Sequence, residues 1–221
     1  MPVIALLAQK GGAGKSTMAV HLAVLSGDAL VLDLDRQQSA TDWWKARDES
    51  LKLPEVVSVP ASDITRGIAR TARQWVFLDT APAIDSDAKL AAKTADLILI
   101  PARPAILDLR AIRHTVGIVR EIGAEGRAVI VLNAAPAGRG AAEAGVVTEA
   151  RRALRAYGLP VAPVAVGNRV SLAHALVDGR AVTEFDPEGR AAQEITSLWE
   201  WLKCHDALKC SSATSSRPRP S

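Results

Sequence analysis

The chain has 221 residues, of which 48% are hydrophobic and 4% aromatic, and a net charge of +3 at pH 7, which suits one large domain with a buried core. No apolar stretch is long enough to span a bilayer, and residues 1–8 lack the length and basic flank of a secretory signal, so we expect a cytoplasmic protein. Arginine greatly outnumbers lysine, which favours phosphate groups and nucleic acid as partners, although a solvated arginine-rich surface would give the same composition.

Strand-like and helical patterns alternate along the chain, which predicts an α/β fold with a doubly wound, mostly parallel sheet in a single domain over residues 1–204. Strands are expected at 3–8, 29–34, 56–59, 75–78, 95–100, 128–132 and 159–166. Helices are expected at 18–25, 41–49, 62–73, 107–122, 141–157, 171–177 and 188–202. Adjacent helical positions face different ways, so either one of Trp43 and Trp44 packs inward or both lie partly in the core. Residues 205–221 are small, polar and proline-bearing, and we expect a disordered tail there.

Residues 9–17 read QKGGAGKST and lie between an apolar strand-like run and an apolar helical pattern. A strand, a glycine-rich loop and a helix in this order are typical of a phosphate-binding loop. Backbone N–H groups of such a loop and the positive end of its helix cradle an anion. Lys15 is then placed to reach the β- and γ-phosphates, and the Ser16 hydroxyl to ligate Mg²⁺. The predicted nucleotide-binding residues of the loop are Gly11, Gly12, Ala13, Gly14, Lys15, Ser16 and Thr17.

The loop departs from the common G-x-x-x-x-G-K-[ST] pattern, because Gln9 replaces the first glycine and Lys10 precedes the glycine pair. The motif K-G-G-x-G-K-[ST] resembles the deviant Walker A loop of the ParA/MinD/nitrogenase-iron-protein group of P-loop ATPases. This resemblance implies ATP and Mg²⁺ as cofactors and a homodimer that forms with ATP. It also implies that Lys10 reaches across the dimer interface to the partner's nucleotide and acts with Lys15 in hydrolysis.

Three aspartates follow strand-like runs, where open α/β sheets place their ligands. Asp33 and Asp35 lie in DLDRQQ, which resembles the D-x-D-P-Q switch I region of ParA-type ATPases, with Arg36 in place of the proline. The resemblance implies that Asp35 positions or activates the attacking water and that Asp33 supports the magnesium shell. A pair of acids that caps a turn is the alternative. Asp79 ends the apolar run WVFLD, as in a Walker B strand, and is expected to hold Mg²⁺ through a water molecule.

Two later segments extend the resemblance along nearly the whole chain. Asn133, in VLNAAP, resembles the family's adenine-side asparagine. Residues 168–195 resemble a stretch that is specific to the partition ATPases. Within it we expect Arg169 and Arg190 to bind duplex DNA without sequence preference, with Arg180 as a weaker candidate. The chain is nearest to the small ParA-type ATPases that lack an N-terminal helix-turn-helix domain.

The function implied by this resemblance is DNA segregation, such as plasmid partition. An ATP-bound sandwich dimer would sit on the nucleoid, bind nonspecific double-stranded DNA and hydrolyse ATP slowly. A centromere- or cargo-binding partner protein would stimulate that hydrolysis. The membrane is not expected as a partner.

Three related classes of protein are the alternatives. A MinD-like membrane ATPase needs a C-terminal amphipathic basic helix; Leu198, Trp199, Trp201 and Leu202 give a short apolar cluster, but the end of the chain has no such periodicity. A metabolic enzyme such as a dethiobiotin synthetase-like ligase would not need the stretch at 168–195. A nitrogenase-iron-protein relative would need cysteines within the nucleotide domain for an iron–sulfur cluster. The two cysteines, at 204 and 210, lie instead near the end of the chain and are expected to be free thiols.

Overall fold

A six-stranded parallel sheet forms the centre of the computed structural model, which describes residues 1–83, 85–138 and 143–208. The strand order is β3-β2-β4-β1-β5-β6, and every neighbouring pair is parallel. The strands are β1 (Val3–Leu6), β2 (Ala29–Asp33), β3 (Glu55–Ser58), β4 (Trp75–Asp79), β5 (Leu97–Ala102) and β6 (Ala128–Leu132). The predicted fold class, a doubly wound parallel α/β sheet, is confirmed.

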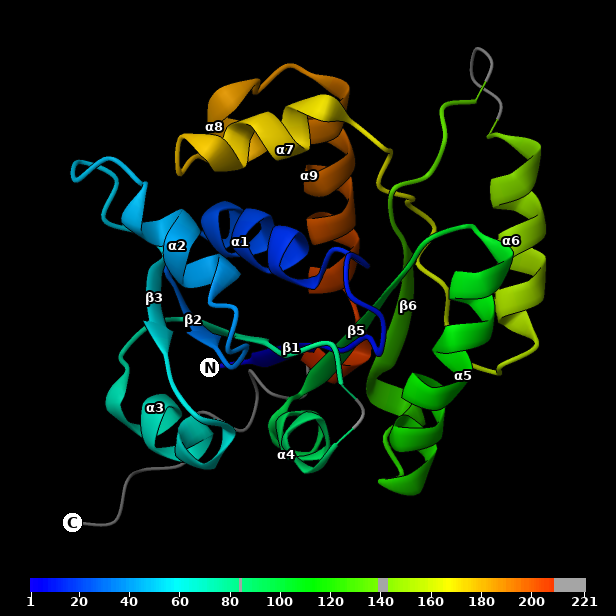
Figure 1. The fold of residues 1–221 in the computed structure, drawn as a ribbon, viewed down its shortest axis with the longest axis horizontal. Helices are drawn as coiled ribbons and strands as arrows, with labels where there is room; N and C mark the ends of the chain where they lie inside the picture. The colour runs from blue at the N-terminus through cyan, green and yellow to red at the C-terminus, as the bar shows by residue number, and fades with distance from the viewer. Residues whose placement is uncertain (84, 139–142, 209–221) are drawn as a thin grey trace.

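Helices cover both faces of this sheet (Figure 1). One layer contains α1 (Lys15–Ser26), α2 (Ser39–Lys45), α7 (Val170–Val177), α8 (Val182–Phe185) and α9 (Arg190–Lys203). The other contains α3 (Ile64–Arg70), α4 (Ser86–Thr94), α5 (Ile106–Glu121) and α6 (Gly145–Arg155), with the short 3-10 turns η1 (Ala61–Asp63) and η2 (Glu125–Arg127) beside them. Each layer packs its own apolar cluster against one face of the sheet.

The strands read as continuous apolar runs because both of their faces are covered. Every residue of β1, β5 and β6 is buried. Side chains of a strand alternate between faces; in β1, Ala5 belongs to the cluster under α3–α6, while Ile4 and Leu6 belong to the cluster under α1 and α9. The polar residues at the strand ends therefore meet at one edge. Asp33 and Asp79 are register partners on β2 and β4.

The expected strand at 159–166 is wrong. This segment runs beside β6, and the stretch to Gly167 makes only isolated bridges, from Val161 to Ile130 and from Gly167 to Ala135. Its sequence contains Pro160 and Pro163, which have no N–H group to donate to a ladder. The segment covers the β6 edge without becoming a seventh strand.

Two helices, α4 and α8, were not anticipated from the sequence. The expected helix at 141–157 begins at Gly145, and its first two expected positions lie outside the described residues. The structured chain also continues beyond the predicted domain boundary at 204, since Leu208 is 3% exposed and packs in the cluster under α1 and α9. The rest of the expected disordered tail, from residue 209, lies outside the described residues.

Candidate nucleotide-binding site

The loop between β1 and α1 leaves the start of α1 open to an anion. Gly14, the N-cap, has a left-handed conformation (φ 96°), and the helix has neither a side-chain cap nor an acidic residue in its first turn. Its first N–H groups and its positive dipole end are thus available to phosphate. A Cβ at Gly14 would collide with the Asn133 side chain, so backbone conformation and packing both require glycine there.

A cleft of about 590 Å³ opens above this loop, between α1, the segment that follows β2, and the ends of α2 and α7. Most of the predicted loop residues line it: Gly11, Gly12, Gly14, Lys15, Ser16 and Thr17. Ala13 does not line the cleft, and its carbonyl accepts a hydrogen bond of 2.7 Å from Asn133 Nδ2. The structure therefore shows Asn133 as a support of the phosphate loop, and its predicted contact with adenine stays a prediction.

Lys15 is a buried cation at the base of the cleft. The residue is only 6% exposed, and no acidic group of the described residues lies within ion-pair distance of its ammonium. Burial lowers the pKa of Lys15, an effect that the carboxylates of Asp79 and Asp35 partly offset. A phosphate anion in the cleft would supply the counter-charge that the Lys15 ammonium lacks among the described residues.

Asp79 is a fully buried carboxylate whose oxygens accept no hydrogen bond of ordinary geometry within the described residues. Burial raises its pKa to about 7; the nearby Asp33 and Asp35 also raise the pKa, whereas the Ser16 hydroxyl and Lys15 lower it. A buried carboxylate without a partner needs an explanation, and a divalent cation bound between Asp79 and Ser16 provides one. Within the described ranges, no group of three or more His, Cys, Asp or Glu side chains is placed to hold a metal ion by itself.

Asp33 and Asp35 have different surroundings. Asp33 is buried; its Oδ1 accepts the Asp35 N–H at 3.2 Å, and its Oδ2 accepts the N–H and the hydroxyl of Thr41 at 2.9 and 2.8 Å. Asp33 thus ties α2 back to the end of β2, a role for Thr41 that the sequence did not reveal. Asp35 lines the cleft. Its role with water, and the role of Asp33 in the metal shell, stay predictions.

Lys10 is absent from the lining of the cleft that its own loop forms. Its Nζ lies 2.5 Å from Asp108 Oδ1 in the first turn of α5, and half of its side chain is exposed. Within one subunit, therefore, this lysine is paired with α5 and lies outside the lining of the cleft, and its role across a dimer interface stays a prediction.

The arginines predicted to bind DNA are not equivalent. Arg169 forms a 2.6 Å ion pair with Glu194, which raises the pKa of Arg169, and only a quarter of its side chain is exposed. Arg180 is paired with Asp178, also at 2.6 Å. Arg190, at the start of α9, is exposed and has no ion pair among the described residues. The Glu194 carboxylate already binds the Arg169 guanidinium, and DNA binding by Arg169 and Arg190 stays a prediction.

The far wall of the cleft comes from α2 and α7. Trp43 is 5% exposed and donates from Nε1 to the Arg180 carbonyl at 3.2 Å, while Trp44 is 40% exposed. One tryptophan therefore packs inward and its neighbour outward, the first of the two predicted arrangements. Leu176 and Val177 complete the wall. Sequence reasoning missed them because nothing local indicates that the end of α7 returns to α2.

Comparisons with known proteins agree with this geometry. The profile of the CbiA family, the CobQ/CobB/MinD/ParA nucleotide binding domain, matches residues 4–197. The chain is 29% identical over 197 residues to the maintenance of carboxysome distribution protein A of Gloeobacter kilaueensis, and the match covers 87% of this chain and 88% of that protein. It is 36% identical over 119 residues to protein ParA of Rhizobium radiobacter, and that match covers 49% of this chain and 51% of that protein.

Solved structures share the fold. A complex of a Cyanothece McdA variant with ATP superimposes with a TM-score of 0.73 over 91% of this chain and 96% of that chain, at 16% identity. The chain belongs to the CobQ/CobB/MinD/ParA nucleotide-binding family, and it is an ATPase.

Proposed function

We propose that this ATPase positions a cellular cargo by cycling between a monomer and an ATP-bound sandwich dimer on the DNA of the nucleoid. The observation that carries the proposal is the place of Lys10, outside its own cleft and beside Asp108. The likeness to a relative named ParA favours a replicon such as a plasmid as the cargo. The likeness to relatives named for carboxysome distribution favours a protein assembly as the cargo. A cargo-bound partner protein would stimulate hydrolysis in either case.

The residues of the cleft would have different roles in phosphoryl transfer. The amides at the start of α1 and the Lys15 ammonium hold the β- and γ-phosphates. Asp35 orients the water that attacks the γ-phosphorus, the bond to the β-phosphate oxygen breaks, and the proton leaves with the phosphate product. Lys10 of the partner subunit neutralises charge that develops on the transferred group. Mg²⁺, held by Asp79 and Ser16, would neutralise phosphate charge further.

Lys10→Ala should retain ATP binding but lose the ATP-dependent dimer and hydrolysis. The lysine does not line its own cleft, so the affinity for ATP should change little, whereas removal of a trans-acting cation costs roughly 10³-fold in rate. Light scattering with a nonhydrolysable ATP analogue and a phosphate-release assay measure the two effects. Lys52→Ala, which removes another exposed lysine, is the matched control. A wild-type protein that stays monomeric with the analogue would contradict the sandwich dimer.

The ATP-bound dimer should bind random-sequence duplex DNA, and Arg190→Ala should weaken this binding. The affinity for DNA falls linearly with salt on a log–log plot, and each lost phosphate contact makes this slope shallower by roughly 0.9. Because a two-fold dimer presents Arg190 twice, the substitution should make the slope shallower by about 2. Arg169→Ala should have the smaller effect because Glu194 already binds that guanidinium. Fluorescence anisotropy with ATP and with ADP measures DNA binding by both variants. Equal DNA binding in the two nucleotides would count against DNA as the surface on which the ATP-bound dimer assembles.

A membrane as the surface to which the ATPase binds, as in MinD-like ATPases, has less support than DNA. The apolar residues of α9 pack in the core: Leu198 and Leu202 are fully buried, and Trp199 lies edge-on to Trp75 with ring centres 4.7 Å apart. The described residues contain no helix that is both long and apolar enough to cross a membrane. Liposome binding in parallel with the DNA assay separates the two surfaces.

A further inference from the structure

Away from the phosphates, a partly buried ion pair joins the end of α2 to α8. Arg47, two residues after α2, has 3% of its side chain exposed, and Glu184 has 24%. Arg47 Nη1 donates to Glu184 Oε2 at 2.8 Å, and Nη2 donates to Oε1 at 2.6 Å. Such a two-bond fork fixes orientation as well as distance. Neither residue lines the nucleotide cleft.

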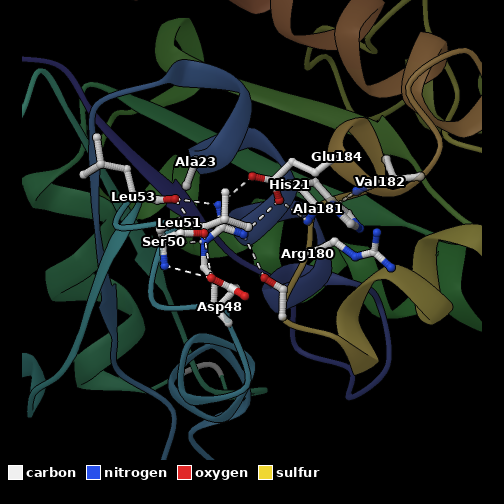
Figure 2. Close-up of polar contacts among 12 residues, drawn as sticks. His21, Ala23, Asp48, Ser50, Leu51, Leu53, Arg180, Ala181, Val182 and Glu184 are labelled. Atoms are coloured by element: carbon white, nitrogen blue, oxygen red, sulfur yellow. Dashed lines mark hydrogen bonds and ion pairs between the residues drawn. The ribbon is translucent and has the colours of Figure 1, made fainter.

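The remaining contacts of Arg47 go to main-chain carbonyls on two separate segments. Its Nε donates to Leu51 and Leu53 at 3.1 and 3.0 Å, and its Nη2 donates to Leu53 at 2.7 Å. Its Nη1 donates to Gly179 at 2.8 Å. Figure 2 shows Leu51 and Leu53 on one side of this network and Glu184 on the other. Every guanidinium nitrogen is therefore used inside the protein.

Beside this ion pair, the main chain after α2 is also in contact with the main chain of the turn between α7 and α8. Gly179, in the turn between α7 and α8, has a φ of +65°, and a Cβ there would collide with the backbone of Ala46 and Arg47. The Arg47 guanidinium also lies 5.2 Å from the centre of the Trp43 ring, within the range of a cation–π contact. The end of α2 and the α7–α8 turn consequently form one packed unit.

The α8 helix is also bonded to α1, the helix that carries the phosphate loop. His21 of α1 is fully buried, and its Nδ1 accepts the Val182 N–H at 3.1 Å (Figure 2). Burial lowers the pKa of His21 to about 4, so the imidazole stays neutral and can accept this bond at neutral pH. A continuous path therefore runs from the phosphate loop through α1 and α8 to Arg47 and α2.

That path ends at the loop that carries Asp35, because Asp33 binds Thr41 at the start of α2. We propose that Arg47 is a positioning residue for ATP hydrolysis: together with Glu184 it holds α2 against α8 and so fixes Asp35 relative to the phosphate loop. The inference rests on the proposed role of Asp35. It predicts that loss of the fork slows hydrolysis while ATP binding, which depends on the start of α1, is retained.

Two conservative variants test this inference. Arg47→Lys keeps the charge but cannot form the fork, and Glu184→Gln keeps the shape but loses the charge. In each, kcat should fall roughly 10- to 100-fold, since a displacement of about 1 Å can cost 10² in rate, while the Kd for ATP changes by less than about threefold, or 0.7 kcal/mol. Phosphate release gives kcat, calorimetry gives Kd, and circular dichroism melts show that each variant is folded.

Arg151 supplies a matched control. It pairs with Glu143 at 3.0 Å and donates to the Ala162 carbonyl, with 16% of its side chain exposed, but it lies on α6 in the other layer. Arg151→Lys should lose stability without losing kcat. A kcat loss in Arg47→Lys and Glu184→Gln no larger than that of Arg151→Lys would overturn the inference, as would equal losses in Kd and kcat.

Asp35→Ala, measured in the same assays, separates the inference from the proposal beneath it. If Asp35→Ala hydrolyses at the wild-type rate, the role of Asp35 fails, and the positioning role of Arg47 fails with it. If Asp35→Ala is inactive while Arg47→Lys is fully active, only the positioning role is overturned.

Discussion

Lys15→Ala is expected to lower the affinity for ATP by roughly 100-fold or more, the scale of removing one partner of a buried charge pair. The Lys15 ammonium is almost completely buried at the base of the cleft and lacks an ion pair within the described chain. No other cation of the loop lines the cleft, because Lys10 is turned toward Asp108. The triphosphate would therefore meet the amides of α1 without a lysine, and binding measured by calorimetry should be lost.

Lys93→Ala is the control for this result. It removes an exposed lysine near the end of α4, in the opposite helical layer, and should leave the affinity for ATP unchanged. A thermal melt of Lys15→Ala without nucleotide confirms that the variant is folded. Wild-type affinity in a folded Lys15→Ala protein would show that the cleft above α1 is not the phosphate site.

Asp79→Asn is expected to stabilise the nucleotide-free protein while abolishing the Mg²⁺ dependence of ATP binding. The Asp79 carboxylate is buried without a hydrogen-bond partner in the described structure, and its pKa is raised to about 7 from an ordinary value of 3.8. The folded state therefore binds its proton more tightly than the unfolded state, and the wild type loses stability as the pH rises through this interval. An asparagine does not titrate and avoids that loss.

The sign and size of the effect can be measured by urea unfolding at several pH values. Relative to the wild type, Asp79→Asn should gain roughly 3 kcal/mol of unfolding free energy between about pH 5 and pH 8. Glu49→Gln, which neutralises an exposed carboxylate, should show no such gain. In the same variants, chelation of Mg²⁺ should weaken ATP binding by the wild type and by Glu49→Gln but not by Asp79→Asn. A parallel pH dependence in Asp79→Asn and the wild type would contradict the buried-carboxylate account.

The phosphate loop could be predicted because its determinants are contiguous. A buried strand, three glycines and an apolar helix follow one another from Val3 to Ser26, and each is recognisable from local sequence. The strands that end at Asp33 and Asp79 could be predicted for the same reason, since parallel strands are continuous apolar runs. Where prolines interrupt such a run, at 159–166, the pattern indicated a strand that backbone hydrogen bonding does not allow.

The contacts that refine the site could not be predicted, because they join residues far apart in the chain. Asn133 supports Ala13 from 120 positions away, and Arg47 meets Glu184 across 137 positions. Nothing in the local sequence distinguishes Arg190, which is exposed, from Arg169, whose charge Glu194 neutralises. Such pairings depend on which helices the fold brings together, and only the three-dimensional structure supplies that information.

The central claim, that each nucleotide is completed by a lysine of the other subunit, can be tested by mixing two inactive variants. Lys10→Ala lacks the lysine that it would donate but keeps Asp35, and Asp35→Ala keeps Lys10; both retain the cleft around Lys15 and should bind ATP. A mixed dimer then holds one complete site, with Lys10 from one subunit and Asp35 from the other.

The measurement is the ATPase rate of the equimolar mixture against each variant alone. If Lys10 acts across the interface, the mixture should recover activity that neither variant has alone, up to about half of the wild-type rate, because a mixed dimer keeps one Lys10 and has one active site of two. If Lys10 acts within its own subunit, neither site of a mixed dimer is complete. A mixture no more active than its two components would contradict the account.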